Sequence, residues 1–359
     1  MNRTTLILIV SGLLPAAALA DNSKGIAAFE ARDFSESIRL LRPAADKGDA
    51  EAQYYLGFAN RNVGLDNADD PKKAVGFLSE SHAWFEKSAL QGYAQAQTEY
   101  ASDFNTGLGA VTDYGKALEW MQKAYANGDE GARLDLQQWY EEGHIVSPSW
   151  EKAQELARAA KPVKDIPGVA SQSELDKLTA QLKANGKRLR AADPGADARR
   201  LAAAEAGDGV QASVIANLAL LEKPEDCGAA TKWSRRAGES GDPFGYTQFG
   251  LLHLQGRCVK QDFSEARRWF SAAAAEGEPW ALLRLARMET FGHGQAPDPA
   301  AAYLHLSLLR LSSDRFREDM APMLVFNRRL LPPEKVSEIN AAAAAQAPAL
   351  VEKQRARKK

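Results

Sequence analysis

A regularly spaced column of bulky residues limits what this chain can fold into more than any other feature of its sequence. Trp233 and Trp269 lie 36 residues apart, as do Trp84 and Trp120, and a glycine follows each of them eight residues later. The whole column consists of Leu40, Trp84, Trp120, Leu156, Trp233, Trp269 and His305. A small residue, alanine or serine, stands three places before every member. This period predicts an array of repeated structural units.

One unit is seen most clearly between residues 241 and 277. Its first half carries Phe249 among small residues, a turn at Gly256 follows, and its second half carries Trp269 among alanines. These spacings are typical of two short antiparallel helices, A and B. Neither helix can bury its apolar side alone, so each unit needs a neighbour on both sides.

The details of the repeat resemble a known family. Residues 107–124, GLGAVTDYGKALEWMQKA, are similar to the Sel1-like repeat, whose pattern joins G-x-G-V-x-x-D to K-A-x-x-W-x-x-K-A. Residues 256–262 match with Cys258 at the second glycine, and residues 292–298 match more weakly. The resemblance covers most of residues 25–313. It implies an all-α, right-handed α-solenoid of helix-turn-helix repeats, related to tetratricopeptide proteins and acting as an adaptor for other proteins.

The pattern predicts a division of the chain into six parts. They are a signal peptide (1–20), an N-terminal repeat array (21–164), a connecting segment with a helix (165–198), a C-terminal array (199–313), capping helices (314–347) and a basic tail (348–359). The first array contains eight surplus residues, which are expected in a loop at residues 63–81. Such a loop is either functional or simply tolerated.

The first 20 residues are typical of an export signal. Arg3 precedes the apolar run Leu6–Leu14, and an A-x-A-like site predicts cleavage near Ala20. The run is shorter than the roughly 20 residues that a membrane helix needs. We therefore expect export without membrane insertion, to the periplasm if the host is a Gram-negative bacterium.

Charge and cysteine content narrow the function further. The 45 basic and 47 acidic residues nearly balance, which gives no case for nucleic-acid binding. Cys227 and Cys258 both lie just before helix B, in neighbouring units whose A–B turns are expected side by side, so an exported chain is expected to join them in a disulfide. Two reduced thiols are the alternative, because the cysteines precede their column residues by different distances.

Catalytic patterns are not found in the sequence. The five histidines are scattered without metal-ligand spacing, and His305 occupies the column, where it is expected to pack. No nucleophile motif or phosphate-binding loop is present. We therefore expect no enzyme, no catalytic residue, no metal and no cofactor, with a small hydrolase that has an unrecognised site as one alternative.

A binding surface is expected on the A helices, which line the inner curve of a helical solenoid. Positions flanking the buried column of helix A should face this concave groove. The predicted partner contacts are Tyr54, Phe58, Arg61, Thr98, Ser102, Gln138, Glu141, Thr247, Leu251, Trp280 and Arg287. Tyrosine, tryptophan and arginine are the side chains that most often anchor protein interfaces. Alternatively, Tyr54 and Phe58 simply pack on the next unit.

The resemblance also implies a more specific role. Exported Sel1-like proteins of this size are similar to immunity proteins that neutralise phospholipase effectors delivered to the periplasm by type VI secretion. Such an antitoxin would be monomeric until its groove clasps the toxin. The alternative from the same fold is a scaffold for cell-envelope or exopolysaccharide assembly machinery.

Overall fold

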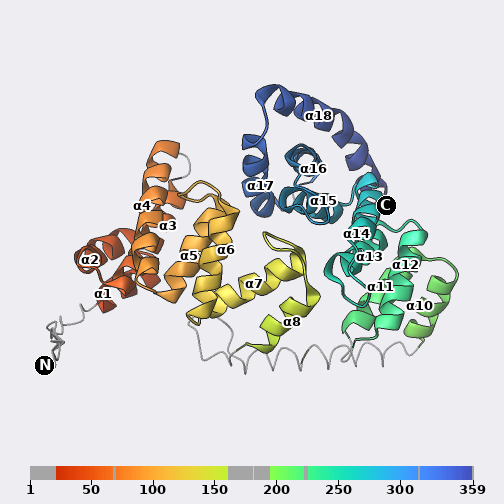
Figure 1. Ribbon diagram of the computed structural model, residues 1–359, viewed down its shortest axis with the longest axis horizontal. Coiled ribbons are helices and arrows are strands. Elements are labelled where there is room, and N and C mark those ends of the chain that lie inside the picture. Colours follow the sequence, from red (N-terminus) through yellow and green to blue (C-terminus); the bar gives the residue numbers. More distant parts are fainter. Residues whose placement is uncertain are drawn as a thin grey trace, which may run out of the picture. The chain divides into compact units, whose positions relative to one another are not determined.

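The computed structural model describes residues 22–67, 70–160, 181, 195–221, 225–313 and 316–357 (Figure 1). These residues form α-helices joined by short turns, with no β-strand among them. The expected all-α solenoid is confirmed. The predicted signal peptide and nearly all of the connecting segment lie outside the described residues.

The chain packs as two compact units, which divide between Val111 and Thr112. The sequence pattern places the end of the first array near residue 164 instead. The packing units therefore differ from the predicted arrays, because the last repeat before residue 164 belongs to the second unit. The two are called unit 1 and unit 2 below.

Unit 1 holds α1 (Ser23–Glu30), α2 (Phe34–Asp46), α3 (Ala50–Asp66), α4 (Pro71–Leu90) and α5 (Ala94–Thr106). Aspartates begin three of these helices: the side chains of Asp33, Asp49 and Asp70 each accept a hydrogen bond from a backbone N–H of the first turn. Leu41, Leu56 and Trp84 are buried together in one core.

The surplus residues of unit 1 do not form the predicted loop at 63–81. Helix α3 runs on to Asp66 and α4 begins at Pro71, so these two helices absorb the extra length. Asp70 and Pro71 explain the early start of α4, because an N-cap aspartate followed by proline favours a helix beginning there.

Unit 2 contains the remaining helices. They are α6 (Tyr114–Ala126), α7 (Glu130–Glu142), α8 (Trp150–Arg158), α10 (Ala196–Glu205), α11 (Gly209–Leu221), α12 (Cys227–Glu239), α13 (Pro243–Gln255), α14 (Phe263–Ala275), α15 (Pro279–Phe291), α16 (Pro299–Ser312), α17 (Arg317–Arg329) and α18 (Pro333–Ala356). Trp233 and Trp269 are buried, as their place in the column predicts. His305 at the same position pairs with Glu289, at 2.7 Å.

Helix α18 closes the C-terminal side of unit 2. It packs along α16, and its last turns bind the connection between α14 and α15. There Lys353 Nζ donates to the Ala275 carbonyl (2.7 Å) and Gln354 Nε2 donates to the Gly277 carbonyl (2.7 Å). The predicted basic tail from residue 348 is therefore helical to Ala356 and partly docked. None of the described helices has the length and apolar character needed to cross a bilayer.

Candidate protein-binding surface

Unit 1 presents a connected group of half-buried aromatic rings on α1, α3 and the residue before α5. Phe29, Tyr54, Tyr55, Phe58 and Tyr93 make up this group, called the aromatic face below. Ring centroids lie 5.1 Å apart for Tyr54 and Phe58, 5.2 Å for Tyr54 and Tyr93, and 5.5 Å for Phe29 and Tyr55. These ring-to-ring distances are those of favourable aromatic pairs.

Tyr54 and Phe58 pack within unit 1 and also keep some exposed surface. Each ring packs on Phe85 of α4, with centroids 6.3 and 5.2 Å away, yet each side chain stays partly exposed. Phe29, Tyr55 and Tyr93 of this face are not among the contacts predicted from the sequence. The signal for them was available, because aromatic residues are dense in the first two repeats.

Arg61, another predicted contact, is held inside unit 1. Its guanidinium pairs with Glu99 (2.5 Å) and Asp103 (2.8 Å) and lies 4.5 Å from the centre of the Phe85 ring. Asp103 is buried, and its second oxygen lies 3.0 Å from Nδ1 of His82. A buried carboxylate needs such partners, so Arg61 stabilises Asp103 inside unit 1. Thr98 and Ser102 are half-buried on α5.

Carboxylates border the aromatic face. Asn22 Nδ2 donates to Asp49 Oδ1 (3.0 Å) and to Glu51 Oε2 (3.1 Å), which brings these two acids together at the start of α3. Burial raises the pKa of Tyr55, and the nearby carboxylates of Glu51 and Glu30 raise it further. Burial and the same Glu51 also raise the pKa of Tyr93. Carboxylates therefore lie close enough to these phenol groups to contribute to their raised pKa, after burial.

In unit 2 the corresponding face of α15 is covered. Every residue from 281 to 290 is buried, including Leu283 and the predicted contact Arg287, which is 5% exposed. Arg287 forms an ion pair with Glu142 at the end of α7. The expectation that Arg287 faces an open groove is therefore wrong, because another segment of the same unit occupies that space.

The covering segment is the turn between α7 and α8, with the last residues of α7. Its backbone carbonyls accept hydrogen bonds from side chains of the second half of the unit: Gln255 to Glu141 (2.6 Å), Arg284 to Glu142 (2.8 Å), His293 Nε2 to Gly143 (2.8 Å) and Gln261 to Pro148 (2.7 Å). Carbonyls at a helix C-terminus have no partner within the helix. These side chains supply the missing donors.

Helix α17 covers α15 as well. Met320 and Met323 belong to the same buried core as Leu283, and Asn327 Nδ2 donates to Thr290 Oγ1 at 2.8 Å. Phe326 adds its ring to Tyr114, at 4.8 Å between centroids. The inner face of α15 is thus part of the core of unit 2.

Burial and nearby charges shift the pKa of three groups at the α7–α8 turn. The pKa of His144 is well below its ordinary value because of burial first, then the charges of Arg287 and His293. Burial likewise lowers the pKa of His293. For Glu142, burial alone would raise the pKa, but Arg287 and Arg284 outweigh it and the pKa is lowered.

The other predicted contacts of unit 2 vary in exposure. Gln138 is exposed and donates to Glu142, and Glu141 is half-buried and accepts a hydrogen bond from Gln137. Thr247 and Leu251 are half-buried on α13. Trp280 is 36% exposed, with its ring 4.3 Å from that of Phe316. These residues do not form a connected face like that of unit 1.

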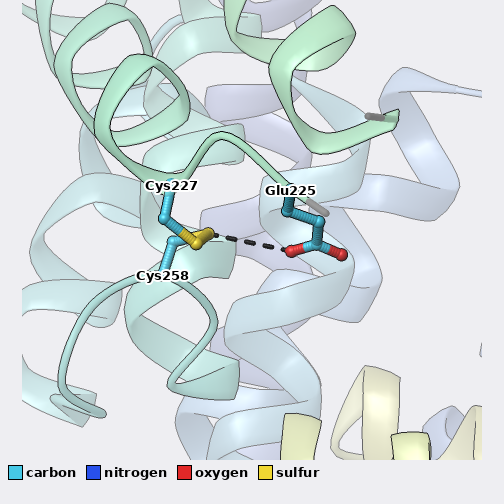
Figure 2. A group of neighbouring side chains, drawn as sticks. All are labelled: Glu225, Cys227 and Cys258. Atoms are coloured by element: carbon cyan, nitrogen blue, oxygen red, sulfur yellow. Dashed lines mark hydrogen bonds between the residues drawn. A yellow bond between two sulfur atoms is a disulfide. The ribbon is translucent and has the colours of Figure 1, made fainter. Parts of the chain in front are cut away.

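The predicted bond between Cys227 and Cys258 is present (Figure 2). Cys258 has a φ of 64°, in the left-handed region where other turns of this chain carry glycine, such as Gly294 (φ 77°). A Cβ on Gly294 would lie 2.4 Å from the Cβ of Phe263, the first residue of α14. Cys227 is likewise the first residue of α12. The disulfide therefore forms where the turn of one repeat meets the start of helix B in the repeat before.

Glu225 completes a small cluster with the two cysteines (Figure 2). Its carboxylate lies 3.8 Å from the Cys258 sulfur and forms an ion pair with Arg257, at 2.9 Å. Two thiolates and a carboxylate are ligands that zinc accepts. Here the sulfurs are bonded to each other, and the carboxylate is paired with a guanidinium.

Comparison with known proteins agrees with the repeat pattern. A family model described as "Sel1 repeat" matches residues 18–49, 50–93, 94–129, 245–278 and 281–308. The repeat around Trp233 is not among these matches, although α11 and α12 form a helix pair there with Trp233 buried.

Two curated relatives are similar to most of this chain. The chitin synthase regulator SKT5 of Saccharomyces cerevisiae is 24% identical over 294 residues, which cover 77% of this chain and 40% of that protein. The uncharacterized protein NMB1327 of Neisseria meningitidis serogroup B is 26% identical over 271 residues, which cover 76% of this chain and 52% of that protein. The chain thus spans about half the length of these relatives or less.

Two solved structures are also similar. One is c5321, a protective antigen of uropathogenic Escherichia coli with an SLR fold: 20% identity, 93% of this chain and 70% of that one, TM-score 0.40. The other is a Sel1 repeat protein from Oxalobacter formigenes: 18% identity, 82% and 100% coverage, TM-score 0.34. At residues 18–129, 245–278 and 281–308, this chain carries Sel1 repeats.

Proposed function

We propose that this protein is a non-enzymatic adaptor that binds a protein partner through the aromatic face of unit 1. Sel1 repeat proteins act as protein-interaction adaptors, and this chain carries such repeats. The observation that carries the proposal is the half-buried, connected set of rings on α1 and α3. Tyrosine is enriched among the residues that dominate binding energies.

The face suits recognition because its side chains are already ordered. Each ring contacts at least one other ring, so little side-chain freedom is left to lose when a partner binds. Tyrosine also offers a large contact area with few rotatable bonds and a hydroxyl for hydrogen bonding. The helices beneath hold the rings in place, and no chemical step is required.

The finer proposal is an immunity protein of the periplasm. Its support is the export-type sequence of residues 1–20 together with the resemblance to exported Sel1-like immunity proteins. The protein would bind a phospholipase effector delivered by type VI secretion and block the entrance to its active site.

The second candidate is a scaffold for machinery that builds an envelope polymer. Its support is the similarity to a chitin synthase regulator, which extends over 77% of this chain. In this role the aromatic face would hold a polysaccharide synthase or one of its assembly partners, rather than inhibit a toxin.

The test is capture of partners by the mature protein carrying Tyr54→Ala and Tyr55→Ala. We expect its affinity for the captured partner to fall by about 2 kcal/mol or more, roughly 30-fold. The matched control is Thr247→Ala with Leu251→Ala, which removes two half-buried side chains of unit 2 and should leave affinity unchanged. Circular dichroism and amide hydrogen exchange establish that both variants fold.

The identity of the captured partner separates the finer proposals. A lipase-like protein supports the immunity role, and a glycosyltransferase or polymer-export protein supports the scaffold. Equal binding by the wild type and by a folded tyrosine variant would remove the aromatic face from the proposal.

A further inference from the structure

We infer that the segment bound on the aromatic face is positively charged, with lysine or arginine side chains lying between the rings and the carboxylates of Glu30, Asp49 and Glu51. This inference rests on the proposed function and specifies the chemistry of the partner. Its basis is the charge around the rings, which the aromatic contacts alone do not fix.

The three carboxylates lie along one border of the aromatic face. Glu30 ends α1, Asp49 is the N-cap of α3, and Glu51 belongs to the first turn of α3. Asn22, itself buried, holds Asp49 and Glu51 together through its amide. Glu30 and Glu51 are exposed, so a ligand can reach both.

Within the described residues, none of these carboxylates has a cationic partner. Some other acids of unit 1 do pair with a cation: Glu36 with Arg39, Glu80 with Arg42, and Glu99 with Arg61. Lys24, Arg32 and Lys47 lie nearest along the chain, and the described structure shows no ion pair between them and the three acids. The three carboxylates therefore have no direct ion pair within the described structure and are available to a cationic ligand.

The carboxylates contribute to the pKa of two tyrosines in the aromatic face. The raised pKa of Tyr55 results from burial first and then from Glu51 and Glu30, and Asp49 contributes at Tyr93. A cation bound here would be stabilised by two attractions, because the faces of aromatic rings and the carboxylates both attract positive charge. An acidic segment would meet repulsion, and a neutral sugar would make no use of the charge.

The experiment measures binding of fluorescently labelled hexalysine by anisotropy, with hexaglutamate as the probe of opposite charge. Glu30→Gln with Glu51→Gln removes two charges and keeps the shape of the surface. Asp49 stays, because its side chain caps α3. The matched control, Glu119→Gln with Glu338→Gln, removes two exposed charges from unit 2.

We expect hexalysine affinity to fall about tenfold in the Glu30/Glu51 variant and to stay unchanged in the control. The wild-type affinity should also decrease as salt is raised, because exposed charges are screened. Equal hexalysine binding by both variants, preference for hexaglutamate, or capture of a neutral oligosaccharide independent of salt would overturn the inference.

Capture of the natural partner by the two double variants distinguishes failure of this inference from failure of the proposed function. If Tyr54→Ala with Tyr55→Ala abolishes capture while Glu30→Gln with Glu51→Gln leaves it intact, the adaptor face stands and its charge preference falls. If neither pair changes capture, the proposed function itself falls. Loss of capture in both double variants supports the proposed function and the charge preference together.

Discussion

The A helices of the two units share one repeat pattern but present very different surfaces. In unit 1, Tyr54 and Phe58 of α3 stay partly exposed within a connected set of rings. In unit 2, Leu283 and Arg287 of α15 are fully covered by the α7–α8 turn and by α17. The comparison teaches that a repeat fixes where the inner face of a helix lies, whereas distant segments decide whether that face is open.

Polar groups explain why the covering of α15 is stable. The last carbonyls of α7 would lack donors, and the guanidinium of Arg287 would be buried without a counter-charge, if the two segments separated inside the fold. Docked together, Arg284 bonds the Glu142 carbonyl and Arg287 pairs with the Glu142 carboxylate. Arg284 and Arg287 of α15 are therefore matched to the end of α7.

The largest effect is expected from breaking this contact with Arg287→Ala. The change leaves Glu142 without its main partner, and unpairing a buried ion pair costs roughly 3–5 kcal/mol. Amide hydrogen exchange should speed up in α15 and at the end of α7, with α3 unaffected. Arg61→Ala in unit 1 should cost less, because Asp103 keeps His82.

A second substitution checks the cause. Adding Glu142→Gln to an Arg287→Met protein should recover part of the stability, since no charge then remains unpaired on that side chain. Unchanged exchange in α15 after Arg287→Ala would show that the ion pair does not hold the α7–α8 turn.

The next effect concerns the disulfide, which has no counterpart among the described residues of unit 1. Closing a loop of 31 residues stabilises by roughly 3–4 kcal/mol in the chain-entropy model. Cys227→Ala with Cys258→Gly removes it, and the glycine relieves the left-handed strain at this position, worth about 1 kcal/mol. We expect a net loss of about 2–3 kcal/mol, measured by urea unfolding.

Cys227→Ala with Cys258→Ala is the companion variant, and it should be less stable than the glycine version by about 1 kcal/mol. A reducing agent should weaken the wild type and leave both variants unchanged. If it leaves the wild type unchanged too, the bond contributes nothing to stability.

A smaller, gradual effect of pH on the stability of unit 2 is expected. Burial holds the pKa of His144 and His293 below the ordinary 6.5. Below that pH the unfolded chain binds protons that the folded chain does not, so the free energy of unfolding falls as pH decreases. The lowered pKa of Glu142 adds a further loss below about pH 4.5, where the unfolded carboxyl becomes protonated.

Thermal unfolding between pH 7.5 and 5.5 measures the histidine part of this effect. His293→Gln keeps a donor for the Gly143 carbonyl and removes one titrating group, so its dependence on pH should be shallower. If unit 2 of the wild-type protein became more stable on acidification, the lowered pKa of His144 and His293 would be contradicted.

The smallest effects should come from two buried tyrosines, one in each unit. Tyr100 donates to Glu86 at 2.9 Å, whereas the Tyr114 hydroxyl has no hydrogen-bond partner among the described residues. Tyr100→Phe should therefore cost about 1 kcal/mol, and Tyr114→Phe should be neutral or slightly stabilising. Urea midpoints that shift equally for the two variants would contradict this contrast.

The sequence alone determined the repeat and the helix pairs, and it led us to expect the disulfide, with two free thiols as the alternative. The 36-residue column placed Trp233 and Trp269 in the core, and the cysteines at neighbouring turn and helix-B positions are joined. These features depend on contacts within one repeat or between consecutive repeats. Such contacts recur with the period of the chain, so a pattern in the sequence can reveal them.

Only the tertiary structure decided which inner face is covered, where α3 and α4 divide, and how far α18 extends. Arg284 and Arg287 reach Glu142 across 142 and 145 residues of sequence, and no period records a pairing of that kind. The aromatic face was also only partly predictable from the sequence. Two of its rings, Tyr54 and Phe58, were predicted, but the contact of Asn22 with Asp49 and Glu51 is a feature of the tertiary structure. Contacts of this kind are fixed by the shapes and charges of particular segments, which a repeat pattern does not encode.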